Sequence, residues 1–187
     1  VVVPRGHIWK SFIPGGGTGR SFTNEYGYVG VSVVQDELMM EGMNEKGLSA
    51  GLFYFPDYGK YEEYSETNYE TNISDFQLVS YILGRCATVD EVKAEIARVH
   101  IHGFDPRSST VHWRFAEPSG RQIVLEIIDG KCVFYENKLG VLTNSPSFDW
   151  QLTNLNNYVN LMPGRTEPHT IGNMSLSSFG GGSAMIG

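Results

Sequence analysis

Short runs of apolar, aromatic and β-branched residues fill the first third of the chain, and polar turns separate them. Residues 28–34 form one such run, and residues 38–43 and 48–55 form two more on either side of a polar turn at 44–47 that ends on a glycine. This pattern predicts a strand followed by a β-hairpin. Residues 57–72 are acidic and rich in tyrosine without a clear periodicity, so we expect a long surface loop after the hairpin.

Two patterns typical of helix N-termini follow. Ser74 precedes Gln77 by three positions, and Thr88 precedes Glu91 by three, which is the spacing of a capping box. Apolar residues then recur at helical spacing, so each helix is expected to cover an apolar surface with one side and to face solvent with the other. These residues are Phe76, Val79 and Leu83 in the first helix and Val89, Val92, Ile96 and Val99 in the second.

Four more strands are predicted at 111–116, 122–128, 131–136 and 139–143. The dipeptide Asp-Gly between the second and third of these runs is a strong signal for a two-residue hairpin turn. Both alternating faces of 122–128 are largely apolar, which is typical of a sheet covered on two sides. We therefore expect a layered α+β architecture, with two sheets face to face and helices outside them.

A third helix is predicted after Asn144, with Ser145 or Ser147 as its cap and an end at Pro163-Gly164. Its apolar positions are Phe148, Leu152, Leu155, Val159 and Met162. The remaining residues to 187 are polar and rich in glycine, and no stop signal closes them. The chain looks like a single domain over residues 1–187 that is incomplete at both ends.

Composition narrows the class of ligand. The 187 residues are 41% hydrophobic and 19% charged, which favours one compact globular domain over a disordered chain. The net charge of −7 leaves no basic stripe, so we expect no nucleic acid partner and a small uncharged or amphipathic ligand instead. No apolar run reaches the roughly 18 residues of a membrane-spanning helix.

Most residues that often carry chemistry have simpler interpretations here. Cys86 and Cys132 lack the spacing of a metal site or a disulfide framework and are expected to be core thiols. The glycine-rich run at 15–20 lacks the ending of a phosphate-binding loop and is expected to be a flexible loop. His100 and His102 have no evident third ligand and follow an amphipathic helix. We therefore expect no metal and no cofactor.

Asn144 is the strongest candidate for a catalytic role. It stands where a predicted strand ends and a helix begins, and an amide held rigidly there can face developing negative charge, as in an oxyanion hole. Taken alone, Asn144 is also typical of a helix-initiating turn, and Tyr54 of an aromatic residue packed at a strand end.

Two segments resemble the choloylglycine hydrolase family, which includes conjugated bile salt hydrolases and penicillin V acylases. They are Met-Asn-Glu-Lys-Gly-Leu at 43–48 with the following Phe-Tyr-Phe-Pro, and Gly-Val-Leu-Thr-Asn-Ser-Pro at 140–146. The resemblance implies the four-layer αββα fold of N-terminal-nucleophile hydrolases, in which an N-terminal cysteine attacks an amide carbonyl and uses its own amino group as the base. It also implies that the Asn144 side-chain amide and the Tyr54 backbone N–H form the oxyanion hole.

The sequence departs from the family at the nucleophile. The family's cysteine, together with an arginine and an aspartate that position it, belongs before the segment matched by residues 1–5, and a further arginine belongs just after Gly187. Neither Cys86 nor Cys132 has a free α-amino group to act as the base. We therefore expect the isolated 187-residue polypeptide to be inactive and the parent protein to be an amidohydrolase.

The resemblance also bears on substrate and assembly. Bile salt hydrolases often have asparagine at the position of Tyr54 and many penicillin V acylases have tyrosine, so Tyr54 favours a phenoxyacetyl amide over a bile acid conjugate without excluding either. Two other functions stay open, namely a non-catalytic homologue that binds amphipathic acyl compounds and a purely structural domain. The resemblance further implies a bacterial source and a homo-oligomer, commonly a tetramer. The compartment is left open, with the cytoplasm favoured over the periplasm.

Overall fold

A computed structural model describes residues 1–105, 107–159 and 167–176 of the chain. These residues belong to two compact units, Val1–Phe148 and Asp149–Gly187. The single incomplete domain that the sequence predicts over residues 1–187 stays a prediction.

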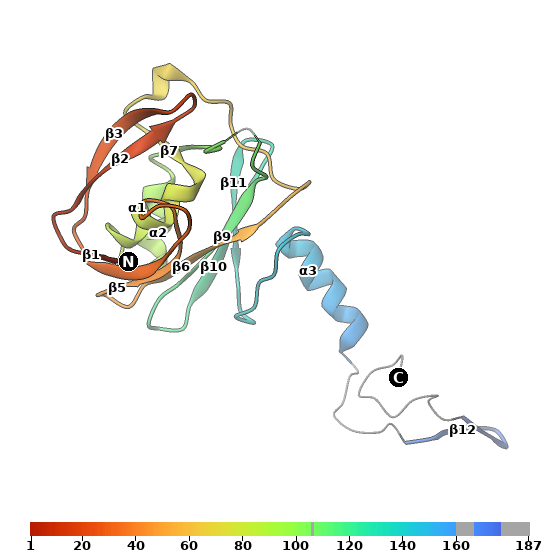
Figure 1. The fold of residues 1–187 in the computed structure, drawn as a ribbon. Coiled ribbons are helices and arrows are strands. Elements are labelled where there is room, and N and C mark those ends of the chain that lie inside the picture. The colour runs from red at the N-terminus through yellow and green to blue at the C-terminus, as the bar shows by residue number, and fades with distance from the viewer. Residues whose placement is uncertain (106, 160–166, 177–187) are drawn as a thin grey trace. The chain divides into compact units, whose positions relative to one another are not determined.

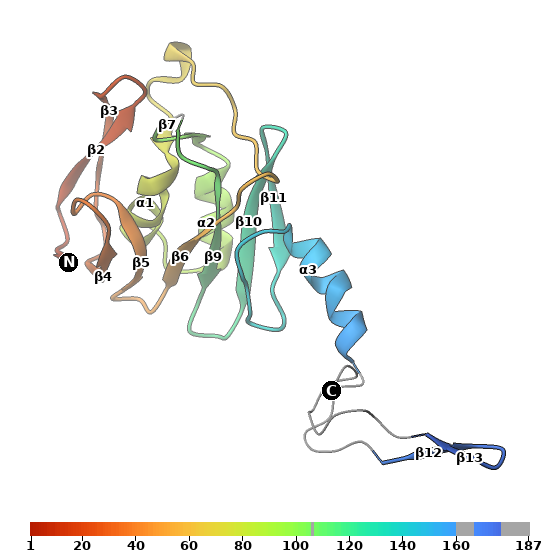
Figure 2. The same cartoon turned by 45° about the vertical axis from the view of Figure 1, so that its right-hand side comes forward.

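The first unit is built on a seven-stranded antiparallel sheet with the strand order β1-β4-β5-β6-β9-β10-β11 (Figures 1 and 2). The predicted hairpin and the predicted later strands join through the pairing of β6 with β9, so they form one sheet where the sequence suggested two. The strands are β1 (Val2–Val3), β4 (Tyr28–Ser32), β5 (Met39–Asn44), β6 (Ser49–Tyr54), β9 (Val111–Ala116), β10 (Gln122–Ile128) and β11 (Lys131–Glu136).

Two small sheets complete the strands of this unit. β2 (Ile8–Ile13) and β3 (Gly17–Thr23) form an antiparallel hairpin, while β7 (Asn72–Ser74) and β8 (His100–His102) pair in parallel. The glycine-rich run at 15–20 is therefore the hairpin turn and the start of β3, and the expected flexible loop is wrong. Gly15 and Gly16 both adopt positive φ angles, which glycine accepts without strain. His100 and His102 lie on β8. The helix that they were expected to follow directly already ends at Ile96.

Two helices lie on one face of the large sheet (Figure 2). α1 (Leu78–Leu83) packs on β5 and β6, and α2 (Val89–Ile96) packs on β9. Their apolar side chains share one core with Leu52 of β6, Trp113 of β9 and Leu125 of β10. His112 and Glu126 are sequence neighbours of two of these core residues, so their side chains project from the opposite face of the sheet. Both are fully buried.

The first predicted helix differs from its expected form. Every residue of α1 is buried, and on the side that was expected to face solvent the ring of Tyr81 packs against Phe22 of β3. The 3₁₀ turn η2 (Asp75–Gln77) precedes α1, and the Ser74 side chain makes no capping bond to its backbone. Gln77 instead accepts a hydrogen bond from the Phe12 N–H and donates one to the Lys10 carbonyl. The capping box predicted at Ser74 is therefore wrong.

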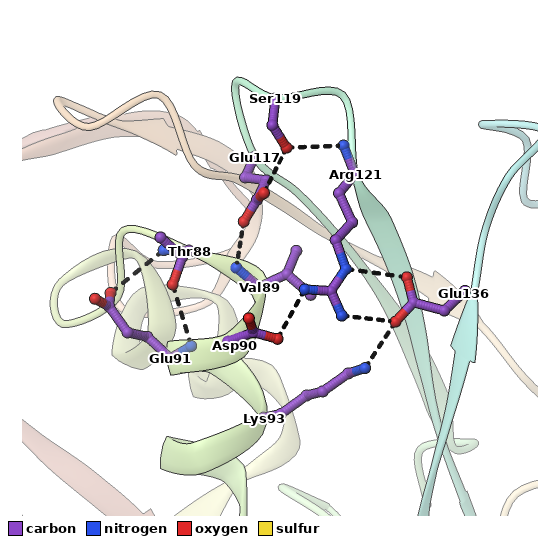
Figure 3. Close-up of polar contacts among 9 residues, drawn as sticks. All are labelled: Thr88, Val89, Asp90, Glu91, Lys93, Glu117, Ser119, Arg121 and Glu136. Carbon is purple, nitrogen blue, oxygen red and sulfur yellow. Dashed lines mark hydrogen bonds and ion pairs between the residues drawn. The ribbon is translucent and has the colours of Figure 1, made fainter.

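The second predicted helix start is confirmed. Thr88 accepts a hydrogen bond from the Glu91 N–H, and the Glu91 carboxylate accepts one from the Thr88 N–H (Figure 3). Figure 3 also shows how this helix end is tied to the sheet. Glu117 accepts from the Val89 N–H, and Arg121 bridges α2 and β11 through its ion pairs. The partners of Arg121 are Asp90 and Glu136, and Lys93 also contacts Glu136.

The segment after β11 departs from the predicted strand at 139–143. Asn137 donates to the Val141 carbonyl and accepts from the Gly140 N–H, and this side chain closes a turn where a ladder was expected. The predicted loop at 57–72 is confirmed up to the short helix η1 (Glu66–Asn68), and its last residue, Asn72, begins β7.

The predicted third helix begins as expected. α3 (Phe148–Leu155) starts at the last residue of the first unit, and η3 (Asn156–Tyr158) follows it. Met162 and the predicted end at Pro163-Gly164 lie outside the described residues. The second unit also holds the hairpin of β12 (His169–Ile171) and β13 (Met174–Leu176). No helix within the described ranges is long and apolar enough to cross a membrane.

Candidate active site

The two residues predicted for the oxyanion hole meet in the structure. The backbone N–H of Tyr54, at the end of β6, donates to Oδ1 of Asn144 over 2.9 Å. Two more hydrogen bonds hold the same segments together, from the Ser145 N–H to the Tyr54 carbonyl and from the Ser145 hydroxyl to the Pro56 carbonyl. Both predicted residues are exposed. Segments 90 positions apart in the sequence therefore form one accessible site.

The chemistry of the contact fixes the orientation of the carboxamide. A backbone N–H only donates, so the atom of Asn144 that faces it is the oxygen, and the amide nitrogen points elsewhere. The site thus places a main-chain donor and a side-chain amide group within one hydrogen bond of each other. Asn144 accepts in this arrangement, and a carboxamide turned to donate beside a free main-chain N–H would suit an oxygen that gains negative charge.

A buried histidine lies beneath this site and touches both of its segments. The Nε2 atom of His112 lies 3.0 Å from the carbonyl oxygen of Thr143, the neighbour of Asn144. The imidazole also stacks on Phe55, the neighbour of Tyr54, with ring centroids 4.4 Å apart and planes 9° from parallel.

Glu126 completes the buried group. Its Oε1 atom lies 3.0 Å from Nδ1 of His112 and accepts a hydrogen bond from the Phe148 N–H over 2.8 Å. Neither His112 nor Glu126 was predicted from the sequence. A signal was present, because Glu126 is the only charged residue in the apolar run 122–128, and charged residues are rarely buried without a specific partner.

Neither cysteine lies at this site or has the character of a nucleophile. Cys86 is buried, as predicted, and burial raises the pKa of its thiol to about 12. Cys132 lies on β11 and is exposed, so its prediction as a core thiol is wrong. Desolvation by the atoms around its sulfur, followed by the charge of Glu62, nevertheless raises its pKa. A raised pKa lowers the thiolate fraction, and the thiolate is the reactive form.

No group of three or more histidine, cysteine or acidic side chains that could hold a metal ion occurs among the described residues. His100 bonds to Glu62 through Nδ1 over 2.8 Å, and His102 is buried with its Nδ1 atom against the Gly103 carbonyl. The two histidines thus have separate partners.

Comparison with known proteins places the chain in a family. A family model described as linear amide C-N hydrolases, choloylglycine hydrolase family, matches residues 1–187. A bile salt hydrolase/transferase of Clostridium perfringens is 33% identical over 175 residues, which cover 90% of this chain and 53% of that protein. A penicillin V acylase of Pectobacterium atrosepticum is 34% identical over 158 residues, which cover 76% of this chain and 41% of that protein. The chain spans about half the length of the curated relatives it matches.

Solved structures agree with these relatives. A variant of the conjugated bile acid hydrolase from Clostridium perfringens superposes with a TM-score of 0.76 at 31% identity, covering 97% of this chain and 55% of that one. The penicillin V acylase from Agrobacterium tumefaciens gives a TM-score of 0.69 at 30% identity, covering 84% of this chain and 47% of that one. These neighbours confirm the predicted α+β fold of the αββα N-terminal-nucleophile type. The chain belongs to the choloylglycine hydrolase family of linear amide C–N hydrolases.

Proposed function

We propose that the protein containing this chain cleaves a linear amide through a cysteine thiolate and stabilises the resulting oxyanion with Asn144 and Tyr54. The observation that carries the proposal is the hydrogen bond between these two residues, which brings two potential donors together at an exposed position. Family membership supports the reaction class, because the members are hydrolases of linear amides.

The proposed hole requires a small rearrangement at the site. The Tyr54 N–H is engaged by Oδ1 of Asn144 before substrate arrives. The substrate carbonyl oxygen replaces Oδ1 at this N–H, and the carboxamide rotates so that Nδ2 donates to the same oxygen. Each donor to a developing oxyanion contributes about 10²- to 10³-fold to kcat. The exchange is favourable in the transition state because a charged oxygen accepts more strongly than a neutral amide oxygen.

The nucleophile is proposed to come from outside residues 1–187. Its sulfur forms a thioester with the acyl carbon as the C–N bond breaks, and the leaving amine takes the proton that the cysteine's own amino group had accepted. Water then hydrolyses the thioester and releases the acid. The high pKa of Cys86 and the position of Cys132 within β11 support this assignment.

The proposed substrates are penicillin V, as the phenoxyacetyl amide, and glycine or taurine conjugates of bile acids. Similarity to both a bile salt hydrolase and a penicillin V acylase supports both classes. The exposed ring of Tyr54 favours the aromatic acyl group, because it offers a flat surface on which a phenoxy ring stacks. A homo-oligomer remains part of the proposal, and light scattering of the purified protein would test it.

Turnover by the full-length protein tests the proposal. Purified protein is incubated with penicillin V and with glycine and taurine conjugates, and the released amine is measured. We expect turnover of at least one class, with penicillin V the better substrate, and a loss of about 10²- to 10³-fold in kcat for Asn144→Ala. Asn156→Ala, which removes an exposed asparagine elsewhere in the chain, is the matched control. Binding of these compounds without turnover would contradict the proposed hydrolase and would support a non-catalytic protein that binds acyl compounds.

A further inference from the structure

We propose that His112 and Glu126 are positioning residues that hold the Asn144 turn against the end of β6. The inference rests on the proposed function, because Asn144 must be a catalytic donor for its positioning to affect the reaction. The geometry that supports it is independent of any substrate.

His112 is the common neighbour of the two segments that form the site. Its Nε2 atom bonds to the Thr143 carbonyl, one residue before Asn144. Its ring lies flat on Phe55, one residue after Tyr54. On the strand side, His112 is paired with Phe53 in the β6–β9 ladder, so its backbone is fixed by the sheet. One rigid side chain thereby sets the distance between the two proposed donors.

Glu126 holds both the imidazole of His112 and the residue Phe148, which follows the Asn144 turn. The Thr143 carbonyl only accepts, so Nε2 of His112 carries a hydrogen, and one further proton lies between Nδ1 and Oε1 of Glu126. The same Oε1 atom accepts from the Phe148 N–H, four residues after Asn144. The pair therefore holds the turn on both sides of Asn144, before it through Thr143 and after it through Phe148.

Burial explains why this support is rigid. His112 and Glu126 are both 0% exposed, on neighbouring strands and on the face of the sheet opposite the helices. A buried polar pair keeps its partners, because breaking either hydrogen bond would leave a polar group unpaired and away from water. The exposed Asn144 has no such burial of its own. The rigidity of the site is thus supplied from the interior.

A double-mutant cycle with Asn144 tests the inference in the full-length protein. His112→Phe keeps a flat ring for Phe55 and removes both hydrogen bonds. We expect it to lower kcat about 10- to 100-fold with KM within about threefold, because a small misplacement of a catalytic group costs that much. In the Asn144→Ala background, His112→Phe should cause no further loss, since the residue it positions is gone.

Two further variants separate positioning from folding. His112→Gln retains a donor for the Thr143 carbonyl and should recover most of the lost kcat. Trp113→Phe is the matched control, because Trp113 is fully buried on the same strand with its side chain on the opposite face. It should lower stability and leave kcat within about threefold, since it disturbs no contact of the turn. If His112→Phe does not fold, His112→Asn replaces it in the cycle, because its shorter amide cannot reach both partners.

The outcomes distinguish this inference from the proposed function. If wild-type turnover is present and depends on Asn144, but His112→Phe leaves kcat unchanged or lowers it equally in both backgrounds, the positioning role is wrong and the hydrolase stands. If the wild type turns over no amide, the NMR signals of the Asn144 side-chain amide test whether His112 positions Asn144. His112→Phe should shift them and Trp113→Phe should not, and unchanged signals would overturn the inference.

Discussion

Tyr54 and Asn144 stand 90 positions apart in the chain and are joined by one hydrogen bond of 2.9 Å, from the Tyr54 N–H to Asn144 Oδ1. The bond has two consequences. It ties the turn that carries Asn144 to the end of β6, and it occupies the main-chain donor until another acceptor displaces it. The contact is therefore both structural and, in the proposed reaction, exchangeable.

The substitution Asn144→Asp separates these two roles. A carboxylate accepts from the Tyr54 N–H as well as an amide oxygen does, but it donates nothing to a substrate oxygen. We expect the unfolding free energy to stay within about 1 kcal/mol of wild type, while kcat falls as far as in Asn144→Ala, about 10²- to 10³-fold. Urea unfolding and steady-state kinetics on the same samples measure both. An active aspartate variant would show that Asn144 does not donate in the transition state.

Asp75 carries a buried charge that makes stability depend on pH. Its Oδ1 atom accepts from the N–H groups of Phe76 and Phe104, and burial raises the pKa of the carboxyl group from 3.8 to about 6. Between these two values the folded protein keeps a proton that the unfolded chain has released. The contribution of Asp75 to stability is therefore fully present below about pH 4 and is lost as the pH rises through 6.

Asp75→Asn should remove this loss. The amide keeps an acceptor for both N–H groups and stays neutral at every pH. A shift from 3.8 to about 6 corresponds to about 3 kcal/mol, so the variant should gain about that much relative to wild type between pH 4 and pH 8. Urea unfolding at both pH values measures the gain, and the exposed Asp36→Asn serves as the control. A stability difference that is the same at both pH values would contradict the buried charge.

Gln77 links the β2–β3 hairpin to the start of α1, where the sequence predicted a capping box. Gln77→Ala leaves the Phe12 N–H and the Lys10 carbonyl without their side-chain partner, and it should cost about 3 kcal/mol of unfolding free energy. Ser74→Ala removes only a 3.2 Å hydrogen bond to Asp75 and should cost about 1 kcal/mol. Thermal or urea unfolding ranks the two. Equal costs would support the capping box instead.

Thr88 is the cap that the structure does contain. Thr88→Ala removes the acceptor for the Glu91 N–H and should cost about 1 kcal/mol, the usual cost of losing an N-cap side chain. Thr88→Ser keeps the hydroxyl and should cost less than half as much. Urea unfolding of the two variants provides the comparison. A serine variant as unstable as the alanine variant would show that the methyl group, rather than the cap, stabilises this helix end.

The sequence predicted best those elements whose signals are local. The strands 111–116, 122–128 and 131–136 have the predicted bounds, because short polar turns separate their apolar runs, with Asp-Gly at 129–130 between the last two. The strand at 139–143 was wrong because the Asn137 side chain captures the backbone groups that a ladder would use. The Ser74 cap failed because a hairpin more than 60 positions earlier takes the Gln77 side chain.

The residues of the candidate site also divide into those with a local sequence signal and those without one. Asn144 was predicted from its place at the end of a predicted strand and from a family resemblance, Tyr54 was predicted from the resemblance alone, and the structure joins them directly. His112 and Glu126 were missed because each contacts residues that only the sheet and the following turn bring close. Local periodicity contains no information on which strand β6 pairs with, and that pairing with β9 is what puts His112 beneath the site.

A crystal structure of the full-length protein with a trapped acyl or tetrahedral species tests the oxyanion hole most directly. We expect the substrate-derived oxygen about 2.7–3.1 Å from both the Tyr54 nitrogen and Asn144 Nδ2, with Oδ1 of Asn144 turned away from the Tyr54 N–H. A structure in which the Tyr54 N–H still bonds to Asn144 Oδ1 while the acyl oxygen is held by other groups would contradict it.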